Sequence, residues 1–596
     1  MFSLPLVLII IIVALVVGLY IRMLYNFGRK VRIVDSVSRT NEVIVKEYKQ
    51  APGPVPWPII GNLSLLARFR VPFEGFTELS NELGDIYTLT LGSTRCLVVN
   101  NLELIREVLN QNGKFFGGRP DFLRYHKLFG GDRNNSLALC DWSSLQQRRR
   151  NLARRHCSPR NSSSYFLKMS NVAAFEASEL MEKMNEKVPT GEEFEIKPLI
   201  QQTCANMFTQ YMCSMRFDYD DTDFQMIVKY FDEIFWEINQ GYALDFMPWL
   251  SPFYKKHTKT IVGWSYNIRK FILERIINDR EQHLDFDEPE RDFTDALLKS
   301  LLEDKNVSRD TIIYMLEDFI GGHSAVGNLV MMSLAYIAKN PSIGKQIQIE
   351  VDAISNKGQR KINLYDMENM PYTMATIYEV LRYSSSPIVP HVATEDTVIA
   401  GYGVTEGTVV FINNYKLNTS CQYWKSPELF EPKRFLETLD EVEITNTQSS
   451  RTCTQSNADK ITETKRRNSE GSDSGIEYDK DALAMSSSVS ESSVLNSFSK
   501  TQNLTKAKHW GRGKIQIKKN IPHFLPFSIG KRTCIGQNLV RGFGFILLAN
   551  IIQQYDVTSK NLSSIKTVPA CVALPTKTFP LVFNPRNAIR ILKEQN

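Results

Sequence analysis

The sequence predicts one large, mainly α-helical domain with a small β region, preceded by a single transmembrane helix. Three observations support this fold class. Helical periodicity of apolar residues dominates from about Leu102 to Asn369, whereas the alternation typical of strands is confined to short segments. The chain has 596 residues, 43% of them hydrophobic, and no shift in apolar content divides it into separate cores. No charged side chain occurs within Met1–Ile21.

Residues 1–21 are the predicted membrane anchor, because about 20 apolar residues suffice for a helix to cross the hydrocarbon core of a bilayer. Basic residues follow at Arg22, Arg29, Lys30 and Arg32, and positive charge favours the cytosolic side. The alternatives are a cleaved signal peptide and a mitochondrial transit peptide. The apolar run is long for a signal peptide and no small-x-small cleavage site follows it, while transit peptides are amphipathic and rich in Arg and Ser.

Residues 22–58 are expected to form a basic flank and a stiff hinge, since four prolines occur between Pro52 and Pro58. The globular domain is expected at 59–596. Within it, residues from about 437 to 519 are rich in Ser, Thr, Asn, Glu and Lys and contain few aromatics. Such a segment cannot bury enough apolar surface to order itself, so we expect a disordered surface insertion.

A long buried helix is expected in the middle of the chain. Ser308 is a plausible N-cap, Asp310 lies in the first turn, and Asn340-Pro341 ends the helix after Lys339. About 30 residues would make it about 45 Å long. The pair Gly321-Gly322 is costly in a helix, which indicates close backbone approach at that point. Short strands are expected at residues 86–91, 95–99, 397–399 and 409–412.

Two bulk properties exclude classes of function. The formal net charge is only +6 and no dense basic stripe with interleaved aromatics occurs, which argues against a nucleic-acid partner. Nine cysteines are scattered singly without a C-x-x-C pair, so neither a disulfide framework nor a zinc site is indicated. A reducing, cytosol-facing compartment fits this cysteine usage.

The most informative stretch is Phe527–Gly536, with the pattern F-x-x-G-x-R-x-C-x-G. A turn just before a helix supplies N–H groups and the positive end of a dipole, which suits Cys534 as a thiolate ligand of haem iron. Gly530 and Gly536 allow a tight turn, Phe527 can cover the sulfur, and Arg532 can pair with a haem propionate. A buried structural cysteine is the alternative, against which five fixed positions in ten residues argue.

With this motif the sequence resembles the cytochrome P450 superfamily, from the proline hinge to the C-terminus. The resemblance implies a mostly helical fold with a small β region, haem b as the cofactor, and monooxygenase chemistry with molecular oxygen. A cysteine thiolate ligand pushes electron density onto iron and favours O–O cleavage. Residues 59–596 would then be a haem-thiolate catalytic domain.

Two further elements carry the resemblance. Glu379 and Arg382 form an E-x-x-R on a predicted helix, where a spacing of three places both side chains on one face. The segment Pro432–Phe435 is similar to the family's P-x-R-F element. The resemblance implies that Arg434 joins Glu379 and Arg382 in a buried network with a structural role.

Two more residues are candidates to bind the haem propionates. His391 lies where the family often has an Arg or His, although an ordinary strand histidine explains it equally well. Trp142 resembles the start of the family's W-x-x-x-R helix, but Gln146 stands where the arginine is expected. If the helix is aligned by Ser158-Pro159 instead, Arg150 takes that position.

The sequence departs from the family in the long helix, at Gly321–Val326. The family pattern there is small-Gly-x-acid-Thr-Thr, in which the acid and the alcohol relay protons. Here Ser324 replaces the acid and Ala325 replaces the alcohol. Protons must then come through Ser324, His323, ordered water or a hydroxyl of the substrate, so Ser324 and His323 are the candidate catalytic residues. The alternatives are a haem-thiolate isomerase or dehydratase that does not use oxygen, and a non-enzymatic haem-binding protein.

Within the family, Gly321–Asn328, Tyr383–His391 and the cysteine motif resemble the insect spook/spookier enzymes of the Halloween group. That resemblance implies ecdysteroid biosynthesis, at an early step after 7-dehydrocholesterol. A flat sterol would need an apolar slot, although each candidate could equally be ordinary core. The candidate lining residues are Phe319, Ala325, Val326, Ile388, Val389 and Val572.

The expected partners follow from what the chain lacks and from its N-terminus. No G-x-G-x-x-G follows a strand and no flavin motif occurs, so an external NADPH-dependent flavoprotein reductase is implied. Its acidic surface would suit basic residues such as Lys531 and Arg541. The apolar N-terminus predicts a single-pass protein of the endoplasmic reticulum membrane, with the catalytic domain facing the cytosol.

Overall fold

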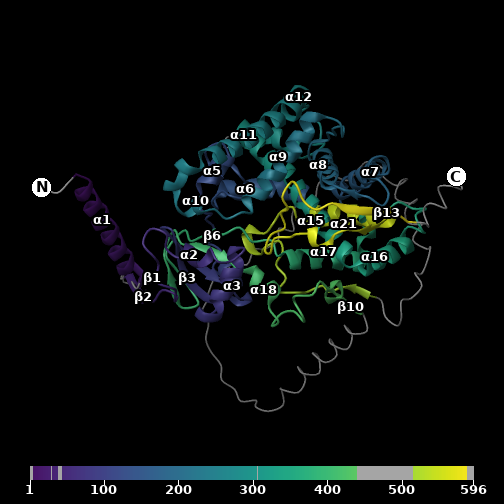
Figure 1. Ribbon diagram of the computed structural model, residues 1–596. Helices are drawn as coiled ribbons and strands as arrows, with labels where there is room; N and C mark the ends of the chain where they lie inside the picture. Colours follow the sequence, from purple (N-terminus) through teal and green to yellow (C-terminus); the bar gives the residue numbers. More distant parts are fainter. Residues whose placement is uncertain (1–3, 28–29, 38–42, 305–306, 439–514, 587–596) are drawn as a thin grey trace, which may run out of the picture. The chain divides into compact units, whose positions relative to one another are not determined.

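The computed structural model describes residues 4–27, 30–37, 43–304, 307–438 and 515–586, and these form a mainly helical structure with small sheets (Figure 1). The prediction of a mainly α fold with a small β region is confirmed. The chain divides into two compact units, Met1–Leu436 with Ile517–Asn596, and Glu437–Gln516. The account below concerns the first unit, because most of the second lies outside the described residues.

The α-helices are α1 (Leu4–Phe27), α2 (Leu63–Leu66), α3 (Pro72–Leu83), α4 (Leu102–Arg106), α5 (Leu123–Leu128), α6 (Ser144–Cys157), α7 (Ser164–Lys187), α8 (Lys197–Cys213), α9 (Thr222–Ile238), α10 (Ala243–Phe246), α11 (Lys255–Ile272), α12 (Asn278–Gln282), α13 (Phe293–Glu303), α14 (Arg309–Ile320), α15 (His323–Lys339), α16 (Pro341–Ile354), α17 (Pro371–Ser384), α18 (Asn414–Thr419) and α21 (Gln537–Gln554). Short 3₁₀ or π segments are η1 (Glu107–Gln111), η2 (Arg133–Asn135), η3 (Pro248–Tyr254), η4 (Leu273–Ile277), η5 (Leu364–Asn369), η6 (Pro432–Phe435), η7 (Gly530–Arg532) and η8 (Leu562–Ser564). The strands are β1 (Val31–Val37), β2 (Val43–Tyr48), β3 (Ile86–Leu91), β4 (Thr94–Val99), β5 (Glu193–Phe194), β6 (His391–Val392), β7 (Thr397–Ile399), β8 (Tyr402–Val404), β9 (Val409–Ile412), β10 (Leu436–Thr438), β11 (Ile515–Ile517), β12 (Tyr555–Thr558) and β13 (Leu581–Pro585).

The largest sheet has the strand order β3-β4-β9-β6. Strand β3 alternates between half-buried and buried residues, as a strand with one face on the core does, whereas all four residues of β9 are buried. Strand β4 pairs with β3 in antiparallel and with β9 in parallel register, and β6 adds His391 opposite Val410. The four strand segments expected from the sequence are therefore confirmed, and the sheet carries His391 at its edge.

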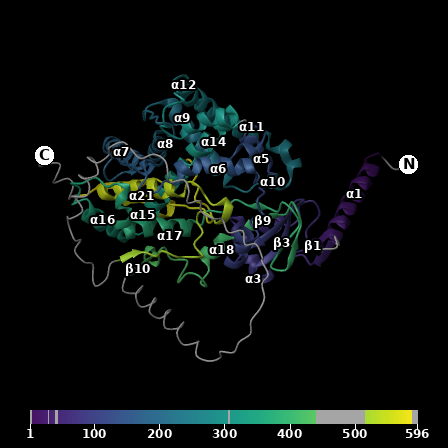
Figure 2. The same ribbon diagram turned by 180° about the vertical axis from the view of Figure 1, so that it is seen from behind.

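The helical core is built around α15, which packs against α8, α17 and α21; both views show α15, α17 and α21 as close neighbours (Figures 1 and 2). Small residues permit this packing. A Cβ atom on Gly327 would collide with the amide of Gln201 on α8, and one on Gly544 of α21 would lie 3.2 Å from Leu329. Helix α15 is buried on nearly all sides, which explains why its sequence lacks a polar face.

The long helix predicted over 308–339 is divided into α14 and α15. Ser308 caps α14 in a capping box with Thr311, and α15 ends at Lys339 as predicted. Between them the backbone tightens into i→i+3 hydrogen bonds, from Ser324 N–H to Gly321 O and from Ala325 N–H to Gly322 O, both 3.2 Å. A Cβ atom at either glycine would come closest to carbonyl oxygens of the preceding turn, Glu317 O at 2.9 Å and Phe319 O at 3.0 Å, and aromatic side chains from other helices approach nearly as closely. A Cβ atom would lie 3.1 Å from the Phe231 ring at Gly321 and from the Phe208 ring at Gly322.

Helix α1 coincides with the predicted membrane anchor, and its described side chains from Val7 to Ile12 are exposed. The apolar helix recognised there, Val7–Gly18, is shorter than a membrane span. Among the described residues, only Arg309–Lys339 is long and apolar enough to span a bilayer, and 83% of its most apolar window is buried in the protein core. The transmembrane anchor therefore stays a prediction.

Two sequence boundaries differ from expectation. Residues 31–48 of the predicted flank and hinge contain the antiparallel strands β1 and β2, which the sequence did not predict. The predicted insertion at 437–519 lies mostly outside the described residues. Its margins are ordered as strands β10 and β11, which pair with each other. The hydrogen bond from Lys518 N–H to Phe435 O, 2.9 Å long, extends this order to residue 518.

Candidate functional site

The cysteine loop runs from Phe527 to the start of α21. Cys534 N–H donates to Phe527 O over 2.9 Å, which closes the loop and leaves the cysteine one short turn before the helix. Gly530 has a φ of +74°, and a Cβ atom there would collide with the Leu109 carbonyl oxygen of η1. Gly530 is thus required both for the left-handed turn and for close approach. Gly536 has an ordinary φ of −81° and open space where a Cβ would stand, so the turn alone does not require glycine there.

Cys534 is exposed, yet the surrounding protein desolvates its thiol, and this burial is the largest influence on the pKa of the thiol. Burial raises its pKa, while the Gly536 N–H and the positive charge of Arg150 lower it. The two descriptions agree for a sulfur that faces a space enclosed by the protein. Of the eight described cysteines, only Cys421 shares its exposure, and the others are buried. An accessible sulfur next to a cation and a helix start suits a thiolate ligand.

Buried basic side chains lie near Arg532 of the cysteine loop, and we call these three arginines and one histidine, Arg119, Arg150, His391 and Arg532, the cationic cluster. Arg150 donates to Thr533 O from α6, and Arg532 donates to Cys140 O over 2.6 Å and to Gly117 O. His391 Nδ1 lies 2.8 Å from Phe116 O. The indole of Trp142 lies under Arg532, with the guanidinium carbon 5.4 Å from the centre of its ring system.

Without an anionic partner, burial and mutual repulsion disfavour the charged forms of the side chains in the cationic cluster. Burial, and then the charge of Arg532, lowers the pKa of Arg119 to about 9 and that of Arg150 to about 10. Burial, and then Arg119, lowers the pKa of His391 well below its usual range. Several buried nitrogens have no hydrogen-bond partner within the described part of the chain: Nε of Arg150, Nε2 of His391, and Nε and Nη1 of Arg532.

Such a cluster fits the anionic edge of haem b. Buried charges without partners are costly, and carboxylates would satisfy them through charge-assisted hydrogen bonds. Cys534 would supply the thiolate that holds the haem iron. The sequence predicted Cys534, Arg532, Arg150 and His391 for this site, and the structure brings all four together.

The sequence did not single out Arg119, the most deeply held cation of the cluster. Its guanidinium donates to the carbonyl groups of Ala138, Val389 and Pro390 over 3.0–3.1 Å. No motif marks it, because its partners are backbone groups of distant segments. Only its place after Gly117-Gly118, in a stretch without helical periodicity, sets it apart in the sequence.

Residues 136–140 form a loop between α5 and α6, the 136–140 loop, whose backbone is held by buried side chains. Four successive carbonyl groups, from Leu137 to Cys140, each accept a hydrogen bond from an Arg or Gln side chain, and Leu137 O also accepts one from Cys140 Sγ. In that order the Gln and Arg donors are Gln146, Arg119, Arg133 and Arg532. Gln146 therefore occupies the expected arginine position as a loop-binding residue. Asp318 of α14 also binds this loop, but as an acceptor: Leu137 N–H and Ser136 Oγ donate hydrogen bonds to its carboxylate.

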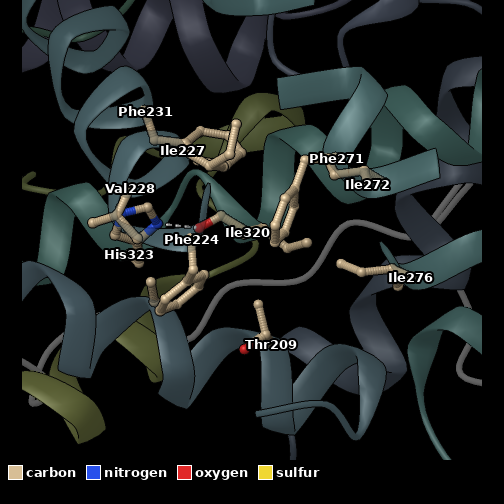
Figure 3. Close-up of a pocket in the computed structure, with 11 residues that line it drawn as sticks. Thr209, Phe224, Ile227, Val228, Phe231, Phe271, Ile272, Ile276, Ile320 and His323 are labelled. Atoms are coloured by element: carbon tan, nitrogen blue, oxygen red, sulfur yellow. Dashed lines mark hydrogen bonds between the residues drawn. The ribbon is translucent and has the colours of Figure 1, made fainter. Parts of the chain in front are cut away.

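The two proposed catalytic residues lie at the start of α15, and both are fully buried. His323 points into a small apolar cavity of about 10 Å³ between α8, α9 and α11 (Figure 3). Its Nδ1 lies 2.7 Å from Ile320 O, and its ring packs edge-on against Phe231. Burial lowers the pKa of His323 to about 4. Its Nε2 lies 3.5 Å from Ser324 Oγ, so the two residues contact each other within the core.

The other proposed site residues divide into two groups. Ala325 is half-buried, as is Val389, whose carbonyl accepts from Arg119. Phe319 and Val326 are packed in the core, where the Phe319 ring lies 5.1 Å from that of Phe293. Ile388 and Val572 are also buried, each 7% exposed. Phe527 is half-buried and packs against the main hydrophobic core.

Glu379 and Arg382 of α17 and Arg434 of η6 form one buried network. Arg382 donates to both carboxylate oxygens of Glu379 over 2.7 and 2.8 Å, and Arg434 donates to Oε1 over 3.1 Å. Arg382 also donates to the carbonyl of Asn418 over 2.6 Å. All polar contacts are internal, so the network joins α17 to the chain that leads toward the cysteine loop.

Comparison with known proteins agrees with this site. Residues 51–450 and 506–583 match the family described as Cytochrome P450. The chain is 60% identical to Cytochrome P450 307a1 of Drosophila melanogaster over 569 residues, which cover 94% of this chain and 95% of the relative. It is 30% identical to Cytochrome P450 1A1 of the dog (Canis lupus familiaris) over 421 residues, 66% of this chain and 77% of the relative. The chain therefore belongs to the cytochrome P450 family of haem b-binding monooxygenases.

Proposed function

We propose that this monooxygenase oxidises a sterol at an early step of ecdysteroid biosynthesis, after 7-dehydrocholesterol. The observation that carries the proposal is the composition of the one open face of the α14–α15 helix. There Gly321, Gly322 and Ala325 present backbone and a single methyl group. These small residues, flanked by the aromatic rings of Phe231 and Phe208 that approach the two glycines, suit a flat, rigid, apolar ring system. The 60% identity to an insect P450 and the motifs shared with the Halloween group support the same substrate class.

Each group of residues in the site would have a separate role in such a reaction. Haem b, when bound, supplies the oxygen-activating chemistry. Cys534 would hold its iron, and the cationic cluster would bind and orient its propionates. Glu379, Arg382 and Arg434 would stabilise the surrounding scaffold. Ser324 and His323 remain the proposed proton route, within a core that excludes bulk water.

We further propose an NADPH-dependent flavoprotein reductase as the electron donor, and anchoring in the endoplasmic reticulum membrane with the catalytic domain in the cytosol. Helix α1, which is apolar and exposed, supports the anchor. Of the two basic residues considered for reductase binding, Lys531 lies over the Trp142 ring and Arg541 donates to Asn538. Both are half-buried, which leaves them a limited part in a docking surface.

The experiment is reconstitution of the full-length protein with reductase, NADPH and 7-dehydrocholesterol, with products identified by mass spectrometry. We expect an oxidised sterol whose formation consumes NADPH and oxygen. Cys534→Ser should lose both the thiolate-type spectrum of the ferrous–CO adduct and the product. Conversion without NADPH would support a haem-thiolate isomerase or dehydratase, and an intact spectrum without any sterol product would support a haem-binding protein; either result would refute the proposal.

A further inference from the structure

One face of the α14–α15 helix differs from the rest. Between Thr311 and Ala338, all of which the structure describes, the residues that are not fully buried are Asp318, Gly321, Gly322 and Ala325. Their spacing of i, i+3, i+4 and i+7 places them on a single helical face. We call these four residues the distal face. Three of them have no side chain beyond a methyl group, so Asp318 is the one polar side chain on it.

The distal face and Cys534 are connected through the 136–140 loop. Asp318 accepts from Leu137 N–H, and Arg532, two residues before Cys534, donates to Cys140 O. Leu137 and Cys140 are three residues apart, a span of at most about 11 Å even in extended chain. Asp318 and the cysteine loop are therefore attached to the same short segment, although 216 residues separate Asp318 from Cys534 in the sequence.

Asp318 retains capacity for a further donor. Its Oδ1 accepts from Ser136 Oγ over 3.1 Å and its Oδ2 from Leu137 N–H. Each carboxylate oxygen can accept two hydrogen bonds, so both keep one free lone pair. Burial raises the pKa of Asp318 to about 7, while the Leu137 N–H lowers it. A carboxyl that is desolvated in this way gains more from a ligand hydrogen bond than one in water does.

The position of Asp318 favours substrate recognition over proton delivery. Seven residues separate it from Ala325, which is about 10 Å along a helix axis. Because Ala325 stands where the family has its relay alcohol, Asp318 is too far along the helix to pass a proton directly at that point. The same separation suits a flat skeleton that lies beside the helix from Asp318 to Ala325, past the Phe231 and Phe208 rings at the two glycines, with its polar end at Asp318.

We propose that Asp318 is a specificity-determining residue, which accepts a hydrogen bond from the hydroxyl group of a sterol lying along the distal face. The inference rests on the proposed function and adds the orientation of the substrate. The hydroxyl-bearing ring lies toward the N-terminal end of the face, and the carbon to be oxidised lies toward Ala325. A sterol without that hydroxyl leaves the Asp318 carboxyl desolvated without compensation and binds more weakly.

The test is an equilibrium binding titration of the full-length, haem-loaded protein. Binding is measured by the change in the haem absorption band. The two probes are 7-dehydrocholesterol and the same sterol lacking its 3-hydroxyl group. The unsubstituted protein is expected to prefer the hydroxylated sterol by about tenfold or more. In Asp318→Asn, which keeps the shape and one acceptor oxygen for Leu137, the preference should fall markedly, and in Asp318→Leu it should approach unity.

Glu317→Gln is the matched control. Glu317 is the neighbouring carboxyl, but it is buried and lies 3.5 Å from Arg269, away from the distal face. The preference for the hydroxylated sterol should be unchanged in this variant. An unchanged preference in Asp318→Asn would overturn the inference and leave the proposed function standing. Loss of the thiolate-type CO spectrum in Asp318→Asn would also overturn it, by showing that Asp318 serves only to hold the 136–140 loop. If neither sterol shifts the haem band of the unsubstituted protein, the proposed function fails and the inference fails with it.

Discussion

Two groups of buried charges in this protein are built on opposite principles. The first joins α8, α9 and α15 to the chain before β13, and we call it the core network. Asp232 accepts from Lys197 over 2.6 Å, from Gln201 over 2.9 Å and from Asn328 over 3.0 Å. Lys197 also donates to the carbonyl of Leu574 over 2.8 Å. Both charges of the core network are satisfied within the protein.

The second group is the cationic cluster beside Cys534. Its members are also buried, but among the residues that the structure describes no carboxylate accepts from their side chains, and four of their nitrogen atoms have no partner there. Burial of charge is tolerated where pairing compensates for lost hydration. The core network thus contributes to the fold of the chain alone, whereas the cationic cluster would gain its counter-charges from the haem propionates under the proposed assignment.

The largest effect is expected in the core network. Asp232→Asn leaves Lys197 buried without its counter-charge and should lower the free energy of unfolding by about 3–5 kcal/mol. The midpoint of urea unfolding, followed by tryptophan fluorescence, measures this. Because burial lowers the pKa of Lys197, the loss should shrink as the pH rises from 7 toward 10, where a neutral amine needs no partner.

Asp223→Asn is a matched control for that variant. Asp223 lies on the same helix, is exposed, and lies 3.8 Å from Arg275 in a surface ion pair. Its replacement should lower the free energy of unfolding by less than about 1 kcal/mol. Equal losses in the two variants would contradict the view that burial gives the core network its strength.

The cationic cluster should respond in the opposite way. Arg532→Met removes two hydrogen bonds but also relieves repulsion with Arg119 and Arg150, so the haem-free protein should change in stability by less than about 1.5 kcal/mol. Haem retention should suffer instead, with dissociation at least about tenfold faster, because a charged hydrogen-bond partner of a propionate is lost. Transfer of haem to excess apomyoglobin, followed by absorbance, measures the rate.

Arg155→Met, on the exposed side of α6, controls for the loss of one positive charge near the site. Arg155 pairs with Glu290 at 3.2 Å, and its loss should leave haem dissociation unchanged. If Arg532→Met strongly destabilised the haem-free protein but retained haem normally, the cationic cluster would stabilise the fold as the core network does. The proposed difference between the two groups would then be wrong.

The sequence was most informative where chemistry is local. The cysteine motif spans ten residues, and its glycine, arginine and cysteine each have a separate physical role, so Cys534 and Arg532 could be proposed as site residues. Helical spacing placed Glu379 and Arg382 on one face, whereas their buried network with Arg434 was implied by the resemblance to the family. Both the motif and the pair rest on neighbours in the chain, whose relative positions the helix or turn determines.

Contacts between distant segments left no such signal. Asp318 meets Ser136 across more than 180 residues, and Arg119 meets Val389 across 270. Periodicity also could not show which face of the long helix is open, because that helix is apolar all round. This is why Phe319 and Val326 were selected with Ala325, although Phe319 and Val326 are packed in the core. The break at Gly321-Gly322 depends on Phe231 and Phe208 from other helices, which the local sequence cannot reveal.

An effect that develops only at acidic pH is expected at His323, a titratable group that belongs to neither cluster. Its pKa of about 4 lies below the value of about 6.5 for an unfolded chain, so the folded state keeps it neutral. The folded state therefore loses stability as the pH falls from 6.5 toward 4, by about 1.4 kcal/mol per pH unit. His323→Leu removes this dependence, so relative to the unsubstituted protein the variant should gain about 2 kcal/mol between pH 6.5 and pH 5. Urea midpoints at pH 7, 6 and 5 test the sign.

The same variant separates two roles of His323 in turnover. A protein whose protons pass through His323 should release more peroxide per NADPH when His323 is replaced by Leu. If His323 only fills the apolar interface beside Phe231, the yield of product per NADPH should be unchanged, and Ser324→Ala then becomes the variant that decides whether α15 supplies a proton at all.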